Sequence, residues 1–264
     1  MLKDRVISGV LGAPVVLLLT WLGGWPLACL VGAISLAGVW ELVGLFERRG
    51  VRARRALAMG ASAAIIAGAT GRDFTVQGIV LAVVTLVAMG IEVFQDSTNI
   101  GAPLVTVFCV IYVPFLLSFL LRLRTLSAVY ALLVVLCTWA TDTAAYFVGI
   151  RFGKRRVLPN ISPRKSVEGA VGGVVAAVVT AMVVAHVAGI PYSSLLAALL
   201  GGLIGVGAEL GDLAESAIKR FCGAKDSGQI IPGHGGVLDR FDSMIFSAPV
   251  AYIVLQLLTG YLVP

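Results

Sequence analysis

Long apolar stretches, separated by short polar segments, cover most of the 264 residues. Nine of these stretches predict membrane helices, because about 20 mostly apolar residues cross the hydrocarbon core of a bilayer. The predicted helices cover residues 6–21, 25–46, 56–70, 76–94, 101–121, 127–150, 168–188, 193–218 and 243–262. The first and third are short for a complete crossing. The pattern therefore predicts an all-α polytopic integral membrane protein with about nine transmembrane helices.

The composition points to the same class. Hydrophobic residues make up 59% of the chain and charged residues 13%, whereas soluble domains carry about 45–50% and about 25%. The four cysteines are scattered without a paired spacing, which argues against disulfides and structural zinc. Because apolar sequence resumes at Trp25, we expect the first segment to be an uncleaved helix and not a signal peptide.

The basic residues predict the orientation in the membrane. If the N-terminus is cytoplasmic and nine helices cross in alternation, 17 of the 20 Lys and Arg residues fall on the cytoplasmic side. This asymmetry follows the positive-inside rule. The polar loops 151–167 and 219–242 then both face the cytoplasm. Topology and anionic headgroups account for the net charge of +6, so nucleic acid is not an expected partner.

The chain is expected to have two regions. Residues 1–126 contain about five predicted helices and no recognisable motif. Residues 127–264 contain about four helices and both cytoplasmic loops, and we expect this second region to be catalytic.

The segment Ser216–Asp242 concentrates charge and glycine in an otherwise apolar chain. Its ionisable residues include Lys219, Arg220, Lys225, Asp226, His234, Asp239, Arg240 and Asp242. A loop of this composition between two membrane-length segments indicates the active site of a membrane enzyme. We refer to it as the 216–242 segment.

Acidic residues inside the predicted helices are the other candidates for chemistry, since each costs about 2.5–3.5 kcal/mol at a helix centre. In the sixth and eighth predicted helices they are Asp142, Glu209, Asp212 and Glu215. An α-helix turns by about 100° per residue, so four residues at the end of the eighth predicted helix and just beyond it lie on one face that leads into the loop: Glu209, Asp212, Ser216 and Lys219. For Glu209 and Glu215, structural pairing with basic residues is the alternative interpretation. Glu41 is assigned no role.

Carboxylates beside a basic, glycine-rich loop indicate a divalent metal that bridges to phosphate. Magnesium binds one or two carboxylates together with substrate oxygens, and Asp212 and Asp239 are the best candidates. Nearby cations would hold phosphates: Lys219, Arg220, Lys225 and Arg240. Gly235 and Gly236 would let backbone amides approach. For His234, a simple polar contact is the alternative to an acid–base role.

The loop 151–169 is the second polar concentration. Ser166 and Glu168 are placed to cap the following helix. From physical arguments alone, a basic loop that only sets topology and a clamp for headgroup or nucleotide phosphates are equally supported.

Three blocks of residues resemble the phosphatidate cytidylyltransferase (CDP-diacylglycerol synthase) family. The 216–242 segment matches the family signature, from Ser216 through Lys225-Asp226 to His234-Gly235-Gly236 and Asp239-Arg240-Phe241-Asp242. Asp142-Thr143-Ala144-Ala145-Tyr146 and the run Ser162 to Gly169 look like the same family. The resemblance covers residues 139–242; residues 1–126 are similar only in hydropathy.

The resemblance implies transfer of the cytidylyl group of CTP to phosphatidate, with magnesium as cofactor, by a homodimer in the lipid bilayer. It implies that Asp212 and Asp239 bind the metal. We add Asp142 and Asp242 as weaker candidates for metal ligands and Asp226 as a secondary residue of the site. Lys219, Arg220, Lys225 and Arg240 would hold phosphates, while Ser162, Lys165 and Ser166 would contact substrate. Whether a second, monovalent cation joins the magnesium stays open at this stage.

Two other functions agree less well with the sequence. A secondary transporter would use Asp142, Glu209 and Asp212 as an ion relay, but the chain lacks the related halves typical of such proteins. A CDP-alcohol phosphatidyltransferase would need an Asp-Gly-x-x-Ala-Arg motif that is absent. Short loops and missing targeting signals favour a bacterial plasma membrane.

Overall fold

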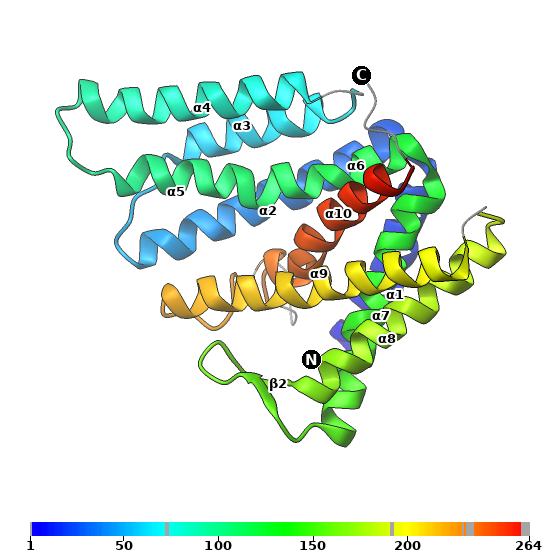
Figure 1. The fold of residues 1–264 in the computed structure, drawn as a ribbon. Helices are drawn as coiled ribbons and strands as arrows, with labels where there is room; N and C mark the ends of the chain where they lie inside the picture. Colours follow the sequence, from blue (N-terminus) through cyan, green and yellow to red (C-terminus); the bar gives the residue numbers. More distant parts are fainter. Residues whose placement is uncertain (1, 72–73, 191–192, 229, 231–234, 260–264) are drawn as a thin grey trace. The chain divides into compact units, whose positions relative to one another are not determined.

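The computed structural model describes residues 2–71, 74–190, 193–228, 230 and 235–259, and of residues 2–11, 258 and 259 only the backbone. Helices dominate this part of the chain (Figure 1). They are α1 (Leu2–Leu22), α2 (Gly24–Arg48), α3 (Arg55–Gly68), α4 (Thr75–Phe94), α5 (Gly101–Val110), α6 (Leu116–Leu126), α7 (Ala128–Phe152), α8 (Val167–Val187), α9 (Ser194–Phe221) and α10 (Leu238–Thr259). A π-helical turn, η1 (Ile111–Phe115), joins α5 to α6 at Pro114, which has no N–H to donate.

Every helix predicted from hydropathy has a counterpart among these elements. Within the described residues, six helical segments are long and apolar enough to cross a membrane: Gly24–Arg48, Thr75–Phe94, Gly101–Leu126, Ala128–Phe152, Val167–Val187 and Ser194–Phe221. An all-α membrane protein agrees with this finding. Nine crossings and the cytoplasmic N-terminus remain predictions.

The chain forms two compact units, and each is described by itself. The first unit combines Met1–Thr125 with Lys219–Phe241. In it, α3 packs against α2 and α4, and α5 packs against α3 and α4 (Figure 1). A charged pair inside this unit joins α4 to the residue before α3, since Arg54 donates to Glu92 and to Gln95. The predicted catalytic loop therefore groups with the N-terminal helices.

The second unit combines Leu126–Ile218 with Asp242–Pro264. Small residues let its helices approach closely, as is usual where helices pack in lipid. Gly172 on α8 faces Val148 on α7, and a Cβ at this glycine would lie 2.7 Å from the valine side chain. Gly201 on α9 leaves similarly little room beside Ala181 on α8.

A two-stranded hairpin interrupts the helices of the second unit and was not predicted. Strands β1 (Arg156–Leu158) and β2 (Ser162–Ser166) pair antiparallel within the basic loop. Ser166 then caps α8, because its hydroxyl accepts from the Gly169 N–H at 3.1 Å. Glu168 accepts from the backbone N–H groups of Lys154 and Arg155. The hairpin places Lys165 at a defined position immediately before α8.

Candidate active site

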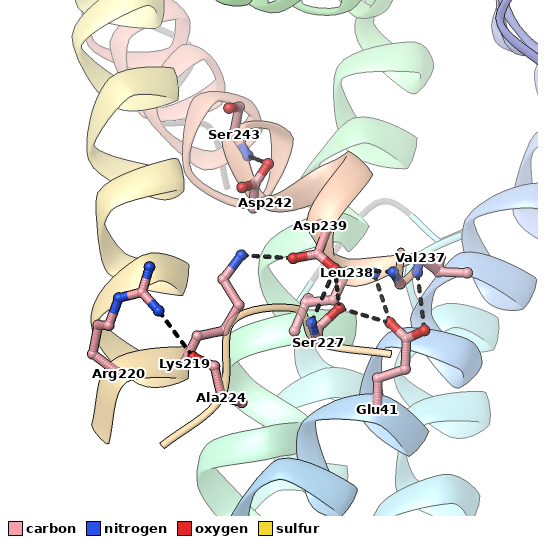
Figure 2. A network of polar contacts seen from close by, with 11 residues as sticks. Glu41, Lys219, Arg220, Ala224, Ser227, Val237, Leu238, Asp239, Asp242 and Ser243 are labelled. Carbon is pink, nitrogen blue, oxygen red and sulfur yellow. Dashed lines mark hydrogen bonds and ion pairs between the residues drawn. The ribbon is translucent and has the colours of Figure 1, made fainter. Parts of the chain in front are cut away.

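Asp239 is the centre of a polar network in the first unit (Figure 2). Lys219 donates to its Oδ1 at 2.6 Å. Its Oδ2 accepts from the Ser227 hydroxyl at 2.8 Å, the Ser227 N–H at 3.0 Å and the Gly236 N–H at 2.9 Å. Asp239 lies in the first turn of α10, where a helix stabilises negative charge. The network fixes both oxygens of a carboxylate that the sequence singled out.

The surroundings of Asp239 keep it ionised. Its burial favours the neutral acid, but the hydrogen bonds from Lys219, Gly236 and Ser227 outweigh burial and lower the pKa of the Asp239 carboxyl below its ordinary value of 3.8. At neutral pH this side chain is therefore an anion with lone pairs to offer a cation.

Glu41, to which sequence reasoning assigned no role, belongs to the same network (Figure 2). It lies on α2 and is only 5% exposed. One oxygen accepts from the Val237 N–H at 3.0 Å, and the other accepts from the Leu238 N–H at 2.9 Å and the Ser227 hydroxyl at 3.2 Å. The available signal was an acid near the end of a predicted membrane helix, a position that is also typical of an interfacial residue. Ser227 was also missed, since no sequence feature distinguished it.

Two glycines of the 216–242 segment make room for Glu41. A Cβ at Gly228 would collide with the Glu41 carboxylate. A Cβ at Gly236 would collide with the Ser227 hydroxyl and would lie 2.5 Å from Glu41 Oε2. At Gly236, the absence of a side chain therefore allows the loop to close on the buried acid.

Replacing Gly236 by alanine is expected to lower the rate of catalysis by about 100-fold, because small displacements of catalytic groups have effects of this size. The added methyl group would push Ser227 and Glu41 apart. Gly60→Ala is the matched control, since a Cβ there meets nothing within 4 Å. The steady-state activities of the two variants provide the comparison, and equal rates would contradict the packing argument.

The remaining candidates of the 216–242 segment have other surroundings. Lys225 and Asp226 are exposed. Arg220 is exposed and donates to the Ala224 carbonyl at 3.1 Å, at the end of α9. Arg240 is exposed on α10. Gly235 has a φ of 85°, a left-handed conformation that favours glycine. His234 lies outside the described residues.

Lys165 organises a second polar cluster, in the second unit. Its ammonium lies 2.6 Å from Glu209 Oε2 and 2.6 Å from Asp212 Oδ2, and it also donates to the Glu209 carbonyl at 3.2 Å. Burial disfavours its charge, but Asp212 and Glu209 more than compensate and raise the pKa of Lys165 above 10.5. The hairpin thus places the Lys165 ammonium against two carboxylates of α9.

Further carboxylates of the second unit lie near this cluster. Asp142 on α7 accepts from the Ser243 hydroxyl at 3.0 Å. Asp242 is 8% exposed, and the charges of Glu215, Asp212 and Asp142 all act on it. Its own carboxylate accepts from the Ser243 N–H at 2.7 Å. The structure therefore brings together most of the acids that the sequence identified inside helices.

Of the predicted contacts in the loop 151–167, Ser166 is buried as the cap of α8, and Ser162 is half-buried at the start of β2. Ser166 also lies against Gly153, where a Cβ would sit 2.6 Å from its hydroxyl. The capping predicted for Ser166 is confirmed, with its hydroxyl as the acceptor, whereas the Glu168 side chain accepts from the N–H groups of Lys154 and Arg155.

Carboxylate oxygens are the main candidate donors for a divalent cation in both polar clusters. The described residues contain no group of three or more His, Cys, Asp or Glu side chains arranged to hold a metal ion. The carboxylates of Glu209 and Asp212 nevertheless already hold one positive charge, the Lys165 ammonium. They are oxygen donors, the kind that magnesium prefers. The carboxylates present therefore have the oxygen donors that a hard divalent cation binds.

Comparisons with known proteins cover the whole chain. A sequence model described as "Cytidylyltransferase family" matches residues 3–258. The phosphatidate cytidylyltransferase of Bacillus subtilis (strain 168) is 34% identical over 265 residues, which cover 97% of this chain and 98% of the relative. That of Thermotoga maritima is 36% identical over 278 residues and 98% of each chain. That of a Synechocystis strain is 30% identical over 284 residues and 97% of each chain.

Proposed function

The chain belongs to the cytidylyltransferase family, and we propose that it transfers the cytidylyl group of CTP to phosphatidate, forming CDP-diacylglycerol and pyrophosphate. The observation that carries this proposal is the similarity to proteins named phosphatidate cytidylyltransferase over nearly their full length. The buried polar clusters around Asp239 and Lys165 support it, because a membrane protein has little other reason to hold so many charges.

The reaction needs charge control more than a strong base. A phosphate oxygen of phosphatidate, which is already anionic, attacks the α-phosphorus of CTP. A new P–O bond forms while the bond to the β-phosphate oxygen breaks, and pyrophosphate leaves with that electron pair. Since both substrates are anions, positioning and electrostatic stabilisation provide most of the catalysis.

We assign the residues accordingly. Asp212 and Asp239 would each act as a ligand for magnesium, with Asp142 and Asp242 in supporting positions. When bound, the metal would neutralise phosphate charge and orient the triphosphate. Lys165 and Lys219 now neutralise carboxylates, and in the substrate complex they would contact phosphate oxygens instead. The other assigned residues would hold or contact substrate: Ser162, Ser166, Arg220, Lys225, Asp226, His234, Gly235, Gly236 and Arg240.

The setting of the reaction is also part of the proposal. The apolar helices make this a multi-pass membrane protein, and we propose the bacterial inner membrane as its location. The site would open to the cytoplasm, which supplies CTP, and the protein would act as a homodimer.

The decisive experiment incubates the purified protein in detergent with radiolabelled CTP, phosphatidate and magnesium. With the label on the α-phosphate of CTP, we expect it in CDP-diacylglycerol while unlabelled pyrophosphate is released, and both products should be lost on addition of EDTA. Diacylglycerol in place of phosphatidate is the control, since it lacks the attacking phosphate. No labelled lipid product under any lipid composition would refute the proposal.

A further inference from the structure

We propose that Glu41 is a positioning residue for this reaction, which extends the catalytic machinery into the N-terminal helices. Through the loop and the first residues of α10, Glu41 would hold Asp239 in the geometry that the reaction requires. The role of Asp239 in binding metal and substrate is taken from the proposed function. Whether Glu41 holds the loop and the start of α10 can be tested separately.

The contacts of Glu41 set the start of α10. Its two oxygens accept from the backbone N–H groups of Val237 and Leu238, the residues at which the helix begins. These amides have no acceptor within their own helix. Asp239 is the next residue along the chain, so the position of its carboxylate depends on where this first turn is fixed.

A shared hydroxyl couples the two carboxylates directly. The Ser227 Oγ lies 3.2 Å from Glu41 Oε2 and 2.8 Å from Asp239 Oδ2. A hydroxyl has one hydrogen to donate, so Glu41 and Asp239 compete for it. When a cation binds Asp239, the Ser227 hydroxyl can donate its hydrogen to Glu41 instead.

The close packing around Glu41 means that only a carboxylate at position 41 can accept from the Val237 and Leu238 amides and from the Ser227 hydroxyl together. Glu41 is buried, and Gly228 and Gly236 lie so close to it that neither has room for a Cβ. Both glycines therefore keep the Glu41 carboxylate in direct contact with the loop. Glutamine has nearly the same shape, but its NH₂ group would face a backbone N–H, where a donor meets a donor.

The test compares Glu41→Gln with Glu47→Gln. Both acids lie on α2, but Glu47 is exposed and forms an ion pair with Arg55, whereas Glu41 is buried and accepts from the loop. Hydrogen exchange of the Val237 and Leu238 amides is measured by mass spectrometry, and kcat is measured with CTP and phosphatidate. We expect Glu41→Gln to speed exchange at these amides and to lower kcat by about 10- to 100-fold, as for other supporting groups behind a metal ligand. Glu47→Gln should change neither.

Each outcome decides a separate point. Unchanged exchange in Glu41→Gln, or a kcat equal to that of Glu47→Gln in an active enzyme, would overturn the proposal. A wild-type protein without cytidylyl transfer would refute the proposed function, while the exchange rates would still show whether Glu41 holds the loop. If Glu41→Gln does not fold, Ser227→Ala replaces it; wild-type exchange and kcat in Ser227→Ala would then overturn the coupling.

Discussion

Asp239→Asn protein is expected to turn over CTP at least about 100-fold more slowly than wild type, because groups that stabilise transition-state charge have effects of this size. Asparagine keeps the shape of the side chain but removes the charge that Lys219 and the proposed metal require. It would also turn an NH₂ group toward Lys219 or toward the donors Ser227 and Gly236. Asp212→Asn should give a loss of the same order.

The matched control is Asp96→Asn. Asp96 is exposed and has a φ of 49°, a conformation that asparagine tolerates. Turnover is measured over a range of magnesium concentrations, with the melting temperature in detergent recorded in parallel. Wild-type kcat in Asp239→Asn would remove Asp239 from the site, whatever its effect on stability.

Lys165→Met is expected to have the second largest effect, on both stability and rate. It leaves Glu209, which is buried, and Asp212 without the ammonium that now lies 2.6 Å from each. Breaking a buried ion pair in this way costs about 3–5 kcal/mol. Because the proposed phosphate contact is lost as well, turnover should fall even in protein that remains folded.

Two comparison variants separate these effects. Lys165→Arg keeps the positive charge and should retain most of the stability, but its planar group is expected to restore the rate only in part. Arg52→Met removes an exposed cation from another loop and should behave as wild type. Melting temperature and turnover at saturating CTP are the two measurements. Full activity in Lys165→Met would show that this cation does not act on substrate.

The apolar periodicity sufficed to predict the helices because it acts locally. Each predicted stretch reappears as a helix with bounds shifted by a few residues, and the long segment beginning at Gly101 continues through Pro114 to Leu126. The motif residues were recognisable for a similar reason, since Asp212 interrupts an apolar segment and Asp239 belongs to a short segment that concentrates charge and glycine.

The hairpin and Glu41 were missed because their roles depend on distant partners. Strand β1 has three residues, too short to give an alternating pattern, and its pairing with β2 is what places Lys165. Glu41 contacts residues that follow it by almost two hundred positions. In sequence it is one acid near the end of an apolar segment, which is also what an interfacial residue looks like.

The sequence by itself determined the class of the protein, its helices and most of the acidic and basic residues that carry the proposed chemistry. These follow from composition and from patterns repeated within a few residues. The tertiary structure decided which charges meet. Lys165 pairs with Glu209 and Asp212, Lys219 pairs with Asp239, and Glu41 joins the loop. The physical reason is that a buried charge must find a partner, and only the folded chain determines which partners come within reach.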